Sequence, residues 1–106
     1  MVKIFHGEEE LTINPSSSPD VHRIRDMVFT KPVTVIFDNC VWNFVYFSEC
    51  VFKQQVIVKQ TGIESIKNIV SFEESKVQGV ILESRVRIEI DALTNFKFIA
   101  QSFDNE

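Results

Sequence analysis

Large apolar residues recur at every fifth position in the middle of the chain. Within the segment 33–58 they are Phe37, Trp42, Phe47, Phe52 and Ile57. Four of them follow, by two positions, a small or medium apolar residue: Val35, Cys40, Val45 or Cys50. The same phase returns after a gap, at Phe72, Val77 and Leu82. A repeat unit of this size cannot bury its own apolar side, so successive units are expected to stack around a shared interior.

Four similar words mark this repeat. They are FDNCVW, FSECVF, FEESKV and LESRVR, and they begin at Phe37, Phe47, Phe72 and Leu82. Each word begins with an apolar residue and two polar or acidic residues, and its fourth position is Cys or Ser. The exception is the fourth word, where Arg85 takes that position. The starting positions are 10, 25 and 10 residues apart, so the five-residue phase survives a long gap.

These words, and above all the run FDNCVWNFVYFSECVF, resemble the pentapeptide-repeat family. In that family a central Leu or Phe, and a small residue two positions before it, point into a four-sided right-handed β-helix. The resemblance is degenerate, covers residues 33–90 and is absent from the first thirty residues. It implies a mainly β fold: a short right-handed β-solenoid of about three coils. The coils have either the family's four sides or the longer, less regular course of a general parallel β-helix.

A coil of about twenty residues predicts which residues stack. It places Phe37, Ile57 and Val77 in one ladder, Phe52 over Phe72, and Trp42 in line with Gly62 and Leu82. The same twenty-residue spacing would stack the apolar Phe47 on the charged Lys67 and Arg87. We therefore expect the register of the later repeats to shift locally by a residue.

Residues 1–32 are expected to form an N-terminal hairpin and one α-helix. The segments 2–5 and 11–13 alternate in polarity around an acidic turn, which favours two paired strands. Ser18 is a suitable N-cap for a helix from Pro19 to Phe29, whose apolar stripe contains Val21, Ile24 and Val28. This helix immediately precedes the first coil, so we expect it to cap the N-terminal end of the solenoid.

The rest of the single domain is the solenoid, residues 33–103. Residues 63–70 have helix-like spacing and fit either a short helical turn or an irregular side of a coil. The segment 94–103 is expected to be a closing strand with an open edge, which makes it a candidate homodimer surface. The alternative fold is an antiparallel β-sandwich or barrel with one helix, which offers no explanation for the phase that survives the gap.

The net charge and the distribution of charged residues limit the classes of partner that this protein can bind. The net charge is −4 and the pI about 5.2, without a cluster of Lys and Arg, which argues against direct binding to nucleic acid or to an anionic membrane. No secretion signal or membrane-spanning segment is evident, so we expect a cytoplasmic protein, in the host cell if the protein is viral. In that compartment Cys40 and Cys50 are expected to be buried free thiols.

No motif for catalysis stands out. His6 with Glu8 and Glu10 could hold a metal ion on alternating strand positions, but an acidic turn explains the same residues. Cys40 has no neighbouring base that would make it a nucleophile. Larger parallel β-helices often degrade polysaccharides, but that link is fold analogy alone. We therefore expect neither an enzyme nor a bound metal or cofactor.

The favoured hypothesis is a non-enzymatic module that binds a protein partner through acidic faces or through its terminal coil. The alternative is a small acidic nucleic-acid mimic or anti-defence inhibitor of viral or mobile-element type, since pentapeptide-repeat proteins that protect DNA gyrase resemble duplex DNA. Its partner is then a nucleic-acid-handling enzyme. At about twenty residues per coil the acidic pairs fall at four different corners, so no single stripe is expected. The candidate interaction residues are Asp38, Glu49, Glu73, Glu74, Glu83, Phe96 and Phe98.

Overall fold

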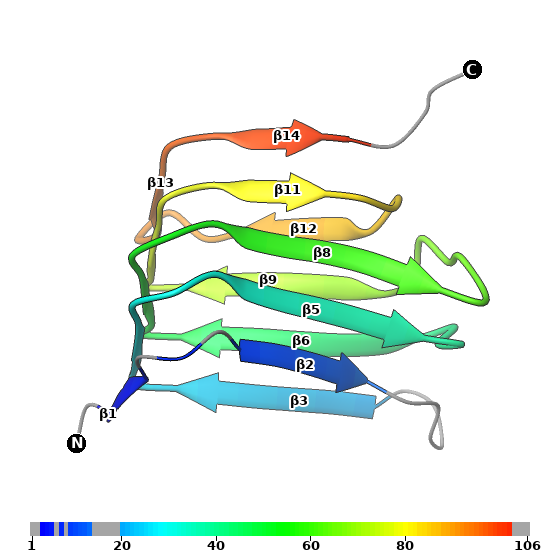
Figure 1. The fold of residues 1–106 in the computed structure, drawn as a ribbon, viewed down its shortest axis with the longest axis horizontal. Helices are drawn as coiled ribbons and strands as arrows, with labels where there is room; N and C mark the ends of the chain where they lie inside the picture. Colours follow the sequence, from blue (N-terminus) through cyan, green and yellow to red (C-terminus); the bar gives the residue numbers. More distant parts are fainter. Residues whose placement is uncertain (1–2, 6, 8, 14–19, 103–106) are drawn as a thin grey trace.

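The chain winds into a β-solenoid of about four turns. A computed structural model describes residues 3–5, 7, 9–13 and 20–102. Within these residues it contains fourteen strands, and every pairing between them is parallel (Figure 1). The predicted solenoid is therefore confirmed, and the antiparallel alternative is wrong.

Three sheets form the sides of the coil, and the chain visits them in rotation. Sheet A contains β1 (Lys3–Phe5), β4 (Met27–Phe29), β7 (Val51–Phe52), β10 (Lys76–Val77) and β13 (Asn95–Phe96). Sheet B contains β2 (Glu9–Ile13), β5 (Val33–Asp38), β8 (Val56–Thr61), β11 (Val80–Leu82) and β14 (Ile99–Gln101). Sheet C contains β3 (Asp20–Arg25), β6 (Asn43–Ser48), β9 (Ile69–Glu73) and β12 (Arg87–Ile90). The coil is thus three-sided where the family resemblance implies four sides.

The predicted capping helix is wrong. Most of the segment from Pro19 to Phe29 forms strands β3 and β4, and Pro19 itself lies outside the described residues. Asp26 has a φ of 56°, which turns the chain between the two strands. Of the predicted apolar stripe, Ile24 packs against the core, whereas Val21 is 44% exposed and Val28 is not among the core residues. A strand, a corner and another strand bring Ile24 and Phe29 to the interior as a helical stripe would.

The predicted N-terminal hairpin is also wrong. Strand β1 pairs with β4 and strand β2 with β5, both in parallel, so the two N-terminal strands start the first turn. Residues 63–70, where the sequence left two interpretations, contain no helix. They make an irregular connection that leads into β9 at Ile69.

The coil is longer than the predicted twenty residues. The paired residues Val33 and Val56 are 23 apart, and Phe47 and Phe72 are 25 apart. The predicted ladders are therefore wrong: Phe37 stands beside Gln60, and Phe52 beside Val77. Six-residue strands in sheets B and C, together with the connection after Thr61, lengthen the turn.

The five-residue rhythm has a simple physical origin. A corner advances the chain by three residues between inward positions, and one step along a strand advances it by two. Phe47, Cys50 and Phe52 show this sum, and all three are buried. The rhythm fails where a connection between two strands has another length. The inward step from Phe52 to Val56 spans four residues, so Ile57 lies on the outer side of β8. Cys40 is followed by a second three-residue step, to Asn43, so Trp42 is 42% exposed.

Aromatic rings fill the interior. Phe29 stacks on Phe52 with centroids 5.1 Å apart, and Phe47 stacks on Phe72 with centroids 5.5 Å apart. Phe47 and Phe52 meet edge to face at 5.0 Å, which joins the two stacks. Stacked and edge-to-face pairs of this kind each contribute about 0.5–1.5 kcal/mol beyond the area they bury.

Candidate interaction surface

The corner between sheets C and A is built in the same way on successive turns. Asp26, Glu49 and Glu74 each follow a strand of sheet C, with φ angles of 56°, 54° and 49°. In the next residue the chain turns inward, to Cys50 after Glu49 and to Ser75 after Glu74. This conformation is the left-handed one that residues with a Cβ adopt at a cost.

Buried small residues stack along this corner and satisfy its backbone. The Cys50 thiol donates to the Ile24 carbonyl oxygen at 3.5 Å, and the Cys50 N–H donates to the Ser75 hydroxyl at 3.1 Å. One turn later the Ser75 N–H donates to the Thr94 hydroxyl at 3.1 Å. The small residue in each word is therefore a hydrogen-bonded spacer that holds consecutive corners in line.

This stacking aligns four carboxyl groups, which we name the acidic column: Asp26, Glu49, Glu74 and Asp91. The Asp26 N–H donates to the Ser48 carbonyl oxygen at 3.1 Å, and the Glu49 N–H to that of Glu73 at 2.9 Å. The Glu74 N–H donates to the Asp91 carboxylate at 3.2 Å. Consecutive members therefore belong to neighbouring turns, about 4.8 Å apart along the solenoid axis.

Like charges act on one another within the column. A side-chain hydrogen bond with Asp26, followed by repulsion from Asp26 and Glu74, raises the pKa of Glu49 above its ordinary value of 4.5. Arg25 opposes this effect from 4.0 Å, but both side chains are half exposed or more, and the net direction stays upward. The acidic column is therefore a row of carboxyl groups, and Arg25 offsets the repulsion between them only in part.

Asp91, the last member of the acidic column, differs from the others because hydrogen bonds stabilise its carboxylate. The Thr94 hydroxyl donates to its carboxylate at 2.8 Å, and the N–H groups of Glu74 and Leu93 also point to it. These hydrogen bonds lower the pKa of Asp91 below its ordinary value of 3.8, the Thr94 hydroxyl first among them. Asp91 is thus charged and fixed in place at the last corner.

The structure brings only some of the predicted acidic residues together. Glu49 and Glu74 share the column, and Glu73 lies beside it, where it accepts a hydrogen bond from the Ser48 hydroxyl at 3.3 Å. Asp38 and Glu83 instead lie at the ends of strands of sheet B: Asp38 is the last residue of β5, and Glu83 follows β11. Asp38 accepts a hydrogen bond from the Thr61 hydroxyl at 2.8 Å. The expectation of four separate corners is therefore wrong, because it assumed too short a coil.

Next to the column, the outer side of sheet C carries an aromatic face that the sequence analysis missed. Phe44 and Tyr46 of β6 project outward together with Trp42, which directly precedes the strand, and neighbouring ring centroids are 6.4 and 6.2 Å apart. The guanidinium of Arg23 lies 4.9 Å from the Tyr46 ring centroid, and the Lys67 ammonium 5.9 Å from that of Trp42. The signal is present in the sequence, because aromatic residues at alternate positions of a strand share one side.

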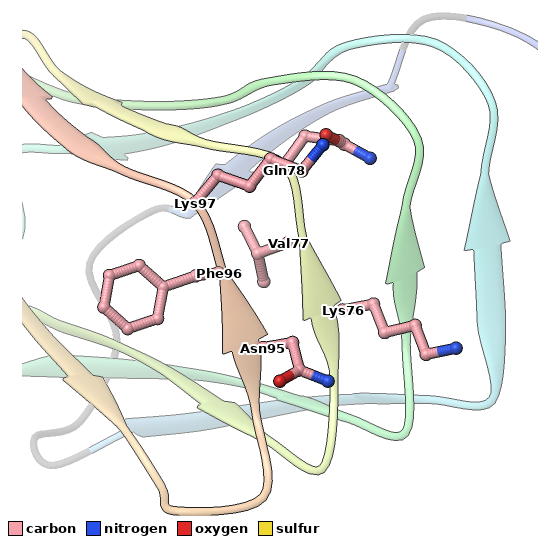
Figure 2. Close-up of a pocket in the computed structure, with 6 residues that line it drawn as sticks. All are labelled: Lys76, Val77, Gln78, Asn95, Phe96 and Lys97. Carbon is pink, nitrogen blue, oxygen red and sulfur yellow. The ribbon is translucent and has the colours of Figure 1, made fainter.

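The other two predicted residues, Phe96 and Phe98, lie in the last turn and are 46% and 42% exposed. Figure 2 shows Phe96 on the far side of β13 from β10, with its ring beyond the last strand of the sheet. The ring of Phe98 occupies the space that a Cβ on Gly79 would take. A shallow pocket of about 200 Å³ lies here, lined by Lys76, Val77, Gln78, Asn95, Phe96 and Lys97.

The described residues offer little reactive chemistry. No group of three or more His, Cys, Asp or Glu side chains among them could hold a metal ion, while His6 and Glu8 of the alternative metal site lie outside them. Cys40 and Cys50 are buried free thiols, as predicted. Burial raises the pKa of the Cys50 thiol, which keeps it protonated and unreactive.

Comparisons of the chain with protein-family models, with curated proteins and with solved structures find no match. What is shown is therefore the parallel β-solenoid itself. Within the described residues there is also no helix long and apolar enough to cross a membrane.

Proposed function

We propose that this protein is a non-enzymatic interaction module that binds a basic surface of a protein partner through its acidic column and the adjoining aromatic face. The single observation that carries the proposal is the alignment of Asp26, Glu49, Glu74 and Asp91 on successive turns. A row of carboxyl groups at one corner is complementary to a row of Lys or Arg side chains.

The residue types at the corner support a role in binding. The left-handed conformation costs a residue with a Cβ about 1–2 kcal/mol, and Gly or Asn adopts it more easily than Glu does. Asn39 and Gly62 take this conformation at the other corner. At Glu49 and Glu74 the chain accepts both the conformational cost and the repulsion that raises the pKa of Glu49. A basic partner relieves the repulsion, which gives a physical reason for the acidic side chains.

The aromatic face supplies apolar contact area beside the charges. Trp, Tyr and Arg are the side chains most enriched at the energetic centres of protein interfaces. Trp42 and Val21, both on this side of the solenoid, are 42% and 44% exposed. Since the outer sides of a solenoid face water, an exposed patch of this kind marks a contact with another molecule. The partner we infer therefore has apolar side chains flanked by Lys and Arg.

The test is a comparative capture with matched baits. The wild-type protein, the variant Asp26→Asn/Glu49→Gln/Glu74→Gln and the control Asp38→Asn/Glu64→Gln/Glu83→Gln are immobilised and exposed to an extract of cells that express the protein. Each triple variant removes three negative charges: the first variant removes them from the acidic column, and the control removes them from positions outside it. We expect a basic protein that the wild type and the control retain and the column variant loses, with retention that weakens as salt increases. Equal retention by all three baits would contradict the proposal.

A second candidate function is a nucleic-acid mimic, which the acidic column also favours. Its four carboxyl groups span three turn spacings, about 14 Å at 4.8 Å each, which is less than half of one DNA turn of about 34 Å. In this case the protein is an anti-defence inhibitor of viral or mobile-element type. The captured partner is then a nucleic-acid-handling enzyme, and duplex DNA competes for it. Loss of the partner on addition of DNA separates this candidate from a general basic partner.

The proposal places the protein in the cytoplasm. Neither Cys40 nor Cys50 forms a disulfide, and both are packed in the interior, where each thiol donates to a backbone carbonyl oxygen. Such cysteines suit a reducing compartment. Intact-mass measurement of the protein from its native cells, with and without a thiol reagent under denaturing conditions, tests this by counting two free thiols.

A further inference from the structure

The last turn of the solenoid presents three unpaired strand edges. Strands β12, β13 and β14 are the terminal strands of sheets C, A and B. Figure 1 shows the chain rising from β12 through β13 to β14, which lies above the other strands. The C-terminal end is therefore a helical ramp whose backbone N–H and C=O groups are open to another chain.

The ramp is apolar where it meets the interior. Phe96 continues the ladder of Phe52 and Val77, and Ile99 continues the ladder of Val56 and Val80. Phe96 is 46% exposed and Ile99 41%, although the residues beneath them are buried. The hydrophobic core thus reaches the last described turn, and no described residue lies above it.

The edges of this turn are short strands, but they lack the Pro and the charged side chains that often protect an open edge. Residues 87–102 contain no Pro and no Gly, and β13 and β14 carry no charged residue. Two cations and two anions leave the turn without net charge, although the whole chain has a net charge of −4. These residues are Arg87, Lys97, Glu89 and Asp91. A second copy of this end therefore meets no electrostatic repulsion.

The N-terminal end is different. Glu9 aligns with Val33 and His22 with Val45, so polar side chains begin two ladders whose next members are buried. Inward-pointing polar residues on an edge strand oppose further pairing. Head-to-tail stacking would bury Glu9 and His22 of one copy against the apolar end of another. The C-terminal end therefore fits a second C-terminal end better than it fits the N-terminal end.

A helical ramp is superimposed on a facing copy of itself by a two-fold axis perpendicular to the solenoid. We propose that two copies of this chain associate in this way, with the axis through β13. Strand β13 then pairs with β13 of the second copy, and β12 pairs with its β14, all antiparallel. The Phe96 rings of the two copies meet at the axis, and Ile88 and Ile90 face Ile99 and Gln101 of the second copy. Every open edge of both ramps finds a partner, which closes the assembly at two copies.

This inference does not depend on the acidic column or on the proposed partner. Sedimentation equilibrium of the 12.3 kDa chain is expected to show a dimer. Phe96→Glu should weaken the dimer by about 100-fold or more, because two carboxylates are buried at the axis. The control Val41→Glu adds the same charge at a side chain that is 53% exposed outside the last turn, and should leave the dimer intact. A wild type that stays monomeric throughout the concentration series overturns the proposal.

A second measurement distinguishes the two-fold pair from other assemblies and does not require a disruptive variant. A nitroxide label at Lys97→Cys lies close to the axis, so the two labels of a dimer should be separated by less than 28 Å, the smallest dimension of the molecule. A label at Lys31→Cys, outside the last turn, should give a longer distance. Growth beyond two copies, or equal distances at the two sites, contradicts the two-fold arrangement.

Discussion

At the residue scale, the fourth position of each sequence word is a hydrogen-bonded spacer. Cys50 and Ser75 occupy equivalent places on neighbouring turns, and each donates to a carbonyl oxygen of the turn before, Ile24 for Cys50 and Phe47 for Ser75. Cys50→Ser should therefore change the free energy of unfolding by less than about 1 kcal/mol. Cys50→Val removes the donor and adds a branched side chain, so it should cost about 2 kcal/mol. Urea denaturation measures both, and equal losses would contradict the spacer role.

The acidic column predicts a pH dependence at the same scale. A folded-state pKa of Glu49 above 4.5 means that this group favours the folded state below that pH and that the contribution is lost as pH rises through the raised pKa. Glu49→Gln should therefore raise the melting temperature near neutral pH. The gain should disappear as the pH falls below 4.5. Thermal denaturation across this range, with Glu83→Gln at another corner as the control, measures it; a gain independent of pH would argue against repulsion in the column.

The sequence predicted the inward residues well wherever one corner and one strand step separate them. Phe47, Phe52, Phe72 and Val77 are all buried, because each pair spans one corner and one strand step. The same count misplaced Trp42, because two three-residue steps follow one another there, from Phe37 to Cys40 and from Cys40 to Asn43. The candidate site was predicted only in part. Glu49 and Glu74 were named from the sequence, but their alignment depends on the length of the coil, which the irregular connection after β8 sets.

At the element scale, local propensity and tertiary structure disagree in the first third of the chain. The segment from Pro19 to Phe29 has the caps and the apolar spacing of a helix, yet β3 pairs with β6 over six residues. Backbone pairing with the sheet and burial of Ile24 outweigh a weak helical preference, because propensities amount to tenths of a kcal/mol per residue. The predicted helix also placed Asp26 outside the coils, so the sequence did not reveal it as the first member of the acidic column.

The fully buried Asn68 amide ties the connection between β8 and β9 to the rest of the turn, which gives a prediction for this element. Asn68 donates to the Cys40 carbonyl oxygen at 2.9 Å and to the Gln60 side-chain oxygen at 2.6 Å, and accepts from the Asn43 N–H at 3.0 Å. Asn68→Asp keeps the shape but replaces the donor with a charge. It should lower the free energy of unfolding by about 3 kcal/mol.

The matched control for Asn68→Asp is Gln54→Glu. It makes the same amide-to-acid change at an exposed side chain that donates to the Thr30 carbonyl oxygen at 3.2 Å. The control should change the free energy of unfolding by less than about 0.5 kcal/mol. Urea denaturation measures the free energy of unfolding of both variants. Similar decreases at the two sites would show that the connection does not depend on Asn68.

At the scale of the whole molecule, each turn contacts only its neighbours, so stability should vary along the solenoid axis. The strands of the middle turns have a paired strand on both sides, whereas β12, β13 and β14 have one. Amide hydrogen exchange should therefore be slowest in β5, β6, β8 and β9 and faster toward both ends. Mass spectrometry of peptides from the exchanged protein measures this order, and uniform protection along the chain would mean that the turns unfold as one unit.

Protein concentration adds a second variable to the same experiment. If the C-terminal ramp of one copy covers that of another, β12, β13 and β14 gain backbone hydrogen bonds, and their exchange should slow as the concentration rises through the dissociation constant. Strands β1, β2 and β3, at the opposite end, should exchange at the same rate throughout. In Phe96→Glu the C-terminal strands should lose this concentration dependence and the middle turns should keep their protection. Slowing at both ends together would instead indicate head-to-tail stacking, because only that arrangement covers β1, β2 and β3.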